Sequence, residues 1–224
     1  MIECDVCIIG AGIAGVSLAA QLAPHKSVVV IDQEAHAGYH ATGRSVAIFT
    51  HALPGSLVAP LTRASVGFFT AGNSVTSAAL QRPRPVLQFG VEQHADALMA
   101  LHKDLASGGG RARLCYGAEV RALVSILRQD QASIAVIDED AFEVDVDALL
   151  QGCLRQAKAR SAQFFLSAPL ASAERISSGW LLRAGDEQIR AQVLVNAAGA
   201  WGDEVAQIAA VQPLGLEPRR RTVA

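Results

Sequence analysis

The chain has 224 residues, of which 51% are hydrophobic, and this length allows one large domain or two smaller ones. Its 19 basic and 21 acidic residues leave a net charge of -2, which excludes a sequence-wide electrostatic attraction to nucleic acid or anionic lipid. The sequence contains no apolar run near the roughly 18 to 20 residues of a membrane span, and its four cysteines lack the spacing of a disulfide framework. We therefore predict a globular, cytoplasmic protein without a membrane span, whose partner is a small molecule.

The first residues predict a β-α-β unit. Residues 6–9 form a short apolar run, and residues 28–31 form a β-branched run without polar interruptions. Such runs are typical of strands buried on both faces of a parallel sheet. Between them, residues 13–23 are small and apolar and suit a helix, which Pro24 ends. This order predicts an α/β fold of the Rossmann-like, dinucleotide-binding type.

A glycine-rich loop joins the first strand to the helix. Residues 10–15 read Gly-Ala-Gly-Ile-Ala-Gly, the fingerprint that places a pyrophosphate on a helix amino end. Gly10 permits the tight turn, Gly12 lets the backbone approach the phosphates, and Gly15 lets the helix pack closely on the strands. The alternative, that these glycines serve packing alone, stays open.

Asp32 follows the second predicted strand, twenty residues beyond Gly12. A carboxylate in this place accepts hydrogen bonds from ribose hydroxyls and repels a 2'-phosphate. The loop and Asp32 together favour FAD or NAD over NADP. They do not separate FAD from NAD.

The middle of the chain predicts a second, inserted domain. Residues 61–69 suit a helix, and a proline-rich stretch precedes a strand expected at 86–91. The three glycines at 108–110 follow no predicted strand, so we interpret them as a turn. Apolar residues recur at helical spacing over 146–157, where we expect the chain to return to the first domain. Further strands are predicted at 163–166, 179–183 and 192–196.

Two segments resemble a known family of flavoproteins. Residues 40–47 (HATGRSVA) and 193–201 (VLVNAAGAW) are similar to the D-amino-acid oxidase-like family of FAD-dependent oxidoreductases. Within it, residues 38–45 (GYHATGRS) and 213–221 (PLGLEPRRR) resemble the D-arginine dehydrogenase branch. The resemblance covers only about the amino-terminal half of a typical member. It implies FAD as cofactor, and a discontinuous FAD-binding domain with an inserted, incomplete α+β substrate domain. The predicted FAD-binding domain comprises residues 1–80 and 143–210, and the partial substrate domain comprises residues 81–142 and 211–224.

The resemblance also implies which residues lie along the flavin nucleotide. Arg44, with a fixed charge and five donors, suits a phosphate or a polarised flavin carbonyl, although a solvated surface arginine is the alternative. The small residues before Trp201 allow close approach of backbone to a ligand, or they serve tight packing alone. The predicted cofactor-binding residues are Gly10, Gly12, Ile13, Ala14, Gly15, Asp32, Gln33, Thr42, Gly43, Arg44, Ser45, Val46, Ala47, Leu170, Ala197, Ala198, Gly199 and Trp201.

The substrate pocket departs from the pattern of the D-arginine dehydrogenase branch. That branch places a histidine, a tyrosine and a glutamate at positions that align with Ile48, Leu53 and Val86 of this chain. A cationic substrate side chain would lose its carboxylate partner here, and an unpaired buried charge is costly. We therefore expect an amino-acid substrate with a neutral side chain.

The resemblance implies oxidation of the CH-NH bond of an amino acid or amine to an imine, with an electron acceptor that the sequence does not specify. Two alternatives remain: an NAD-dependent dehydrogenase, and a truncated, non-catalytic nucleotide-binding fragment or subunit. No metal site is predicted, because Cys4 and Cys7 suit core packing and His36 and His40 flank a loop glycine. The basic run at 219–221 is interpreted as a solvated edge or the start of a strand, and contact with phosphate is the alternative.

Overall fold

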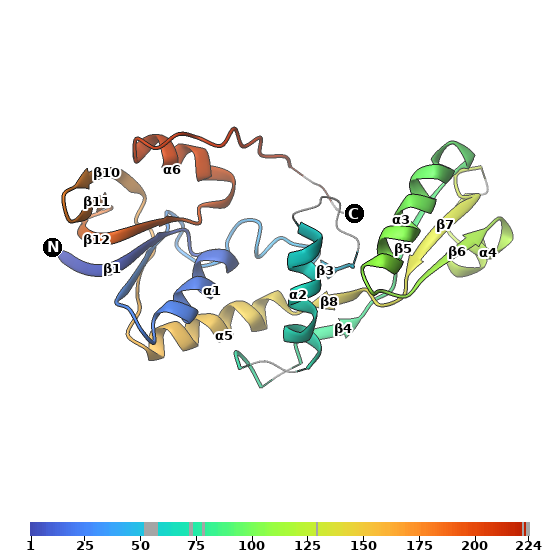
Figure 1. Cartoon of the computed structure of the whole chain (residues 1–224), viewed down its shortest axis with the longest axis horizontal. Helices are drawn as coiled ribbons and strands as arrows, with labels where there is room; N and C mark the ends of the chain where they lie inside the picture. The colour runs from blue at the N-terminus through green and yellow to red at the C-terminus, as the bar shows by residue number, and fades with distance from the viewer. Residues whose placement is uncertain (52–57, 72–73, 78, 129, 221, 223–224) are drawn as a thin grey trace. The chain divides into compact units, whose positions relative to one another are not determined.

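A computed structural model describes residues 1–51, 58–71, 74–77, 79–128, 130–220 and 222 of the chain (Figure 1). The chain folds into two compact units. Unit 1 consists of Met1–Ser45 and Val146–Ala224, and unit 2 consists of Val46–Asp145. None of the helices within the described residues is long and apolar enough to cross a membrane.

Unit 1 is built on a six-stranded sheet in the order β10-β11-β12-β1-β2-β9. In its centre β1 pairs in parallel with both β2 and β12, and β2 pairs in parallel with β9. The strands β10 and β11 continue the sheet in antiparallel orientation beside β12. The strands are β1 (Ile2–Ile9), β2 (Val28–Ile31), β9 (Gln163–Phe165), β10 (Leu170–Ile176), β11 (Gly179–Ala184) and β12 (Glu187–Asn196).

Helices follow the parallel strands, as the β-α-β pattern predicts. Helix α1 (Ile13–Leu22) connects β1 to β2 and packs against α5 (Val146–Ala159), beside which it runs in Figure 1. The short helices η2 (Gly199–Trp201) and α6 (Gly202–Ile208) follow β12, and α6 contacts β10 and β12. The α/β fold class with a parallel sheet is therefore confirmed.

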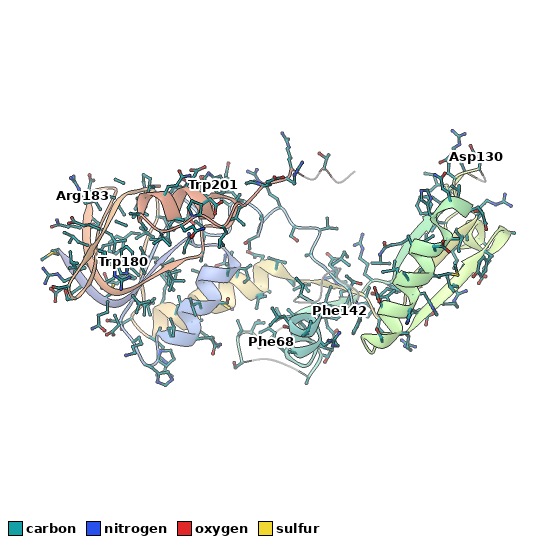
Figure 2. All side chains as sticks on the ribbon, turned by 45° about the horizontal axis from the view of Figure 1, so that its top comes forward. Phe68, Asp130, Phe142, Trp180, Arg183 and Trp201 are labelled. Atoms are coloured by element: carbon teal, nitrogen blue, oxygen red, sulfur yellow. The ribbon has the colours of Figure 1, made fainter. Side chains whose placement is uncertain are left out.

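The core of unit 1 explains the hydrophobic runs in the sequence. All four residues of β2 are buried, as expected for a strand covered on both faces. Cys4 and Cys7 lie in the same buried cluster as Trp180 and Leu182, which agrees with the prediction of core packing (Figure 2). Burial raises the pKa of the Cys4 thiol to about 11 and that of Cys7 to about 12, so both stay protonated at neutral pH.

The described residues of unit 2 form two three-stranded sheets, in the orders β3-β8-β4 and β5-β7-β6, whose strands pair in antiparallel orientation. Helix α3 packs on the second sheet, and Phe49, Phe69 and Phe142 join α2 to the first sheet. The elements are β3 (Ile48–Phe49), α2 (Val58–Thr70), β4 (Gln81–Pro83), β5 (Val86–Gly90), η1 (Glu92–His94), α3 (Ala95–Ser107), β6 (Ala112–Tyr116), α4 (Ala118–Leu123), β7 (Ile134–Asp138) and β8 (Phe142–Val144).

The two units differ from the predicted domains in two segments of the chain. Residues 46–80 belong to unit 2, because Ile48 pairs with Glu143 and the Val144 amide donates to the Ala47 carbonyl. The segment after residue 210 belongs to unit 1 rather than to the inserted domain, because the carboxylate of Asp203 accepts hydrogen bonds from its backbone.

Candidate functional site

Two glycines where β1 leads into α1 leave no room for a Cβ atom. Gly10 has a φ of +109°, and a Cβ on it would lie 2.4 Å from the carbonyl oxygen of Ala197. A Cβ on Gly15 would lie 1.9 Å from the carbonyl oxygen of Gly10. These two positions require glycine, because both obstacles are backbone atoms that no rotamer change removes.

The amino end of α1 meets the loop that contains Thr42. The Ile13 amide donates a hydrogen bond to Thr42 Oγ1 at 3.0 Å, and Gly12, which caps the helix, contributes no capping side chain. A Cβ on Gly12 would lie 3.3 Å from Thr42 Oγ1. Gly12 therefore leaves the first turn of α1 without a capping side chain of its own. A helix amino end of this kind suits an anion.

Asp32 ties the end of β2 to the glycine loop. Its Oδ2 atom accepts the Ala11 amide at 2.6 Å, and its Oδ1 atom accepts the Glu34 amide at 2.8 Å. A carboxylate has about four acceptor positions, so acceptor capacity remains after both bonds. Asp32 is half-buried. The structure therefore gives this carboxylate a role in shaping the loop that its position in the sequence did not reveal.

These elements border a cleft of about 790 Å³ that lies wholly within unit 1. This size falls within the range of about 300–1,000 Å³ that is typical of small-molecule sites. The cleft brings together most of the predicted cofactor-binding residues from five separate stretches of the chain. Those that line it are Gly10, Gly12, Ile13, Ala14, Asp32, Gln33, Thr42, Arg44, Leu170, Ala197, Ala198, Gly199 and Trp201.

Other predicted cofactor-binding residues do not line this cleft. Gly15 is buried behind it, and a Cβ on Gly43 would lie 2.6 Å from the Gly38 carbonyl oxygen, so both glycines serve close packing. Ser45 is the last residue of its segment in unit 1 and is exposed, whereas Val46 and Ala47 begin unit 2.

Two of the three residues predicted for the substrate pocket lie in strands of unit 2. Ile48 is half-buried in β3 opposite Glu143, and Val86 is half-buried in β5 opposite Asp138. Leu53 lies outside the described residues. The role of these positions stays a prediction.

A cluster of aromatic and charged side chains on the cleft wall joins the predicted Arg44 and Trp201 to three residues that the sequence analysis missed, Glu34, Tyr39 and His40. His40 Nε2 lies 2.7 Å from Glu34 Oε1, and the His40 ring lies 4.4 Å from the Trp201 ring between centroids. The Arg44 guanidinium stands 4.8 Å from the centroid of the Tyr39 ring. All five side chains line the cleft. The only sequence signal was the aromatic and basic composition of residues 39–44.

Comparison with protein families decides the identity of this fold. Residues 5–224 match the family model described as "FAD dependent oxidoreductase", abbreviated DAO. The chain belongs to the DAO family of FAD-dependent oxidoreductases. FAD is accordingly the cofactor that membership of the DAO family assigns to the chain.

Solved structures share the fold of this DAO-family chain at low sequence identity. L-α-glycerophosphate oxidase from Mycoplasma pneumoniae, determined with FAD bound, has a TM-score of 0.82 and 15% identity over 94% of this chain and 58% of its own. Glycine oxidase from Geobacillus kaustophilus has a TM-score of 0.80 and 18% identity over 95% of this chain and 60% of its own. L-amino acid deaminase from Proteus myxofaciens has a TM-score of 0.74 and 21% identity over 91% of this chain and 47% of its own. The chain thus spans less than two thirds of the length of these proteins.

The cleft itself fits a flavin dinucleotide. Its volume accommodates a ligand of that class, and Gly12 leaves the amino end of α1 without a side chain that would obstruct a diphosphate. Arg44 supplies a cation on the same wall. The donor set therefore matches the anionic centre and the polar ribose of FAD.

Proposed function

We propose that unit 1 holds FAD in the cleft, with the diphosphate on the glycine loop at the amino end of α1. The geometry of residues 10–15 carries this proposal, because Gly10 and Gly15 permit the tight turn onto α1 and Gly12 leaves the helix amino end without a side chain. Asp32 would accept a hydrogen bond from a ribose hydroxyl with the acceptor capacity that its two backbone bonds leave.

The reaction proposed for the whole enzyme is oxidation of the CH-NH bond of an amino acid to an imine. Bound FAD supplies the hydride acceptor. This chain's residues hold and orient the cofactor, and the small residues Ala197, Ala198 and Gly199 keep one wall of the cleft free of bulky side chains. Glycine oxidase and L-amino acid deaminase among the structural relatives support an amino-acid substrate.

The proposed substrate has a neutral side chain. The resemblance to the D-arginine dehydrogenase branch suggests the D-series, while Ile48, Leu53 and Val86 replace the polar groups expected around a cationic side chain. We expect an aliphatic D-amino acid to be turned over faster than D-arginine. Comparable turnover of D-arginine and an aliphatic D-amino acid in a steady-state assay of a full-length version of the enzyme would contradict this part of the proposal.

Titration of the purified chain with FAD tests the central claim. We expect saturable quenching of flavin fluorescence and a yellow protein after gel filtration. Asp32→Asn should weaken FAD binding roughly tenfold, because the amide leaves one of the two backbone N-H groups without an acceptor. Asp186→Asn, at an exposed turn of the same unit, is the matched control and should bind FAD normally. A colourless chain that binds NAD, or neither nucleotide, would overturn the proposal.

A further inference from the structure

The segment of residues 214–220 is fastened to α6 by a single carboxylate. Asp203 Oδ1 accepts the Leu214 amide at 2.9 Å, and Oδ2 accepts the amides of Gly215 and Leu216 at 2.9 Å and 2.7 Å. These three backbone N-H groups hold the pKa of the Asp203 carboxyl below its usual range. The segment is otherwise without helix or strand, so the Asp203 carboxylate fixes its path.

A side-chain contact secures the same segment a second time. A Cβ on Gly202 would lie 2.9 Å from Leu216 Cδ1, which shows that the leucine packs directly over the start of α6. The Gly202 carbonyl is in turn held by the Asn196 side-chain amide at 2.7 Å. The start of α6, the end of β12 and the 214–220 segment therefore form one connected structure.

This attachment brings two arginines to the cleft. Pro218, Arg219 and Arg220, which follow Leu216 in the chain, line it. Both arginines are exposed, as the sequence predicts, but they border the ligand site rather than open solvent alone. Arg219 Nη2 lies 2.5 Å from Glu217 Oε2, so part of its charge is already matched.

The charge of the cleft depends on these two residues. Its lining includes the three carboxylates of Asp32, Glu34 and Glu204. Among the described residues, Arg44 is the one lining arginine that does not belong to the 214–220 segment. Without Arg219 and Arg220 the acidic groups would prevail at a site for an anionic ligand. With them the lining contains as many arginines as carboxylates, which removes the acidic excess that would repel a diphosphate.

We propose that Arg219 and Arg220 bind the phosphate groups of the nucleotide in this cleft, and that Asp203 is a positioning residue that holds the 214–220 segment in place for them. The proposal rests on the placement of FAD given above. It assigns the segment a direct part in cofactor binding, which was the less favoured interpretation of its basic run.

Nucleotide titrations of charge variants test the two arginines. We expect the double variant Arg219→Gln/Arg220→Gln to weaken binding of FAD and of ADP roughly tenfold or more, and to reduce the dependence of affinity on salt concentration. Binding of adenosine, which lacks phosphate, should not change. Arg183→Gln is the matched control, since Arg183 is exposed on β11 of the same unit and lies outside the cleft lining (Figure 2). Equal losses for ADP and adenosine would overturn the proposal.

A mutant cycle tests the positioning role of Asp203. Asp203→Asn should expose the amides of residues 214–216 to faster hydrogen exchange and weaken ADP binding by a similar factor to the double arginine variant. Adding Asp203→Asn to that double variant should then cause little further loss, because both changes remove the same contact. Additive losses, or unchanged exchange at these amides, would overturn the role of Asp203. Failure of the unaltered chain to bind FAD would instead refute the proposed function, while normal FAD binding by all variants would refute this inference alone.

Discussion

The two units place their polar side chains in opposite ways. In unit 1, Asp32, Glu34 and His40 stand at the rim of a cleft, partly exposed and with their hydrogen-bonding partners arranged around an open space. In unit 2, His51 and Asp138 are buried in the interior, at 8% and 2% exposure. The Thr50 hydroxyl donates to Asp138 Oδ2 at 2.7 Å.

This difference separates polar groups that serve a ligand from polar groups that shape a fold. Within the described residues, Asp138 Oδ1 and His51 Nδ1 are buried without a hydrogen-bond partner. Buried polar atoms of this kind reduce stability. The rim of the cleft in unit 1 avoids that cost, because its polar atoms keep access to solvent or to a nucleotide. Substitutions of polar residues at the cleft of unit 1 should therefore chiefly lower the affinity for FAD, and substitutions of the buried polar residues of unit 2 should chiefly lower the free energy of unfolding.

Gly15→Ala is expected to have the largest effect, since it breaks this division by harming binding and stability together. Its Cβ would overlap the Gly10 carbonyl, so the backbone must move. We expect FAD binding to be lost and the free energy of unfolding to fall by about 3 kcal/mol, as measured by flavin titration and urea unfolding. Gly67→Ala, inside α2 with no atom within 4 Å of the new Cβ, is the control and should be stabilising by about 0.5–1 kcal/mol. Normal FAD binding by Gly15→Ala would refute the account of the loop.

Thr50→Val should sharpen the comparison by affecting unit 2 alone. Valine keeps the shape of threonine but removes the hydroxyl donor to the buried Asp138 carboxylate, leaving the His51 amide at 3.4 Å. The expected loss is about 1–3 kcal/mol of unfolding free energy, with the affinity for FAD unchanged. A lowered affinity would show that the division between the units does not hold.

Asp140→Asn is expected to have the smallest effect and to appear only in the pH dependence of stability. Arg111 donates its amide to Asp140 Oδ2 at 2.7 Å and its guanidinium to Oδ1, which lowers the pKa of the carboxyl. Because the folded-state pKa lies below the ordinary value of 3.8, this stabilisation is present above that value and is lost as the pH falls through the folded-state pKa. The pair is solvent-exposed, so we expect a loss below about 1 kcal/mol at neutral pH. Urea unfolding of the unaltered chain and of Asp140→Asn at neutral and acidic pH measures this loss. A difference in unfolding free energy that is as large in acid as at neutral pH would contradict the prediction.

Local patterns predicted the first third of unit 1 well. The spacing of Gly10, Gly12 and Gly15 between an apolar run and a helix is a contiguous signal, and Asp32 follows at a fixed distance along the chain. The turn at residues 108–110 also agrees with the structure, where Gly108 caps α3 and Gly109 has a φ of +88°. Each of these features depends on neighbours in the sequence, so a reader of the sequence has the relevant information.

Features that depend on distant pairing were not predictable in this way. The two-residue strand β3 shows no periodicity and is defined by its pairing with β8, so the sequence offers no local signal for where unit 2 begins. The wall position of Arg219 and Arg220 depends on Asp203, and the contact between His40 and Trp201 joins the loop after β2 to the segment after β12. Such contacts become visible only in three dimensions.

The contact between Gly10 and Ala197 has a consequence for the order of folding. One edge of β1 pairs with β2, which follows it in the chain after a single helix. The other edge pairs with β12, which is synthesised only after the whole of unit 2. Bringing such distant segments together costs loop-closure entropy before any contact repays it. We therefore expect unit 2, a single continuous stretch of chain, to form early, and the nucleotide loop to reach its final shape among the last events on the pathway.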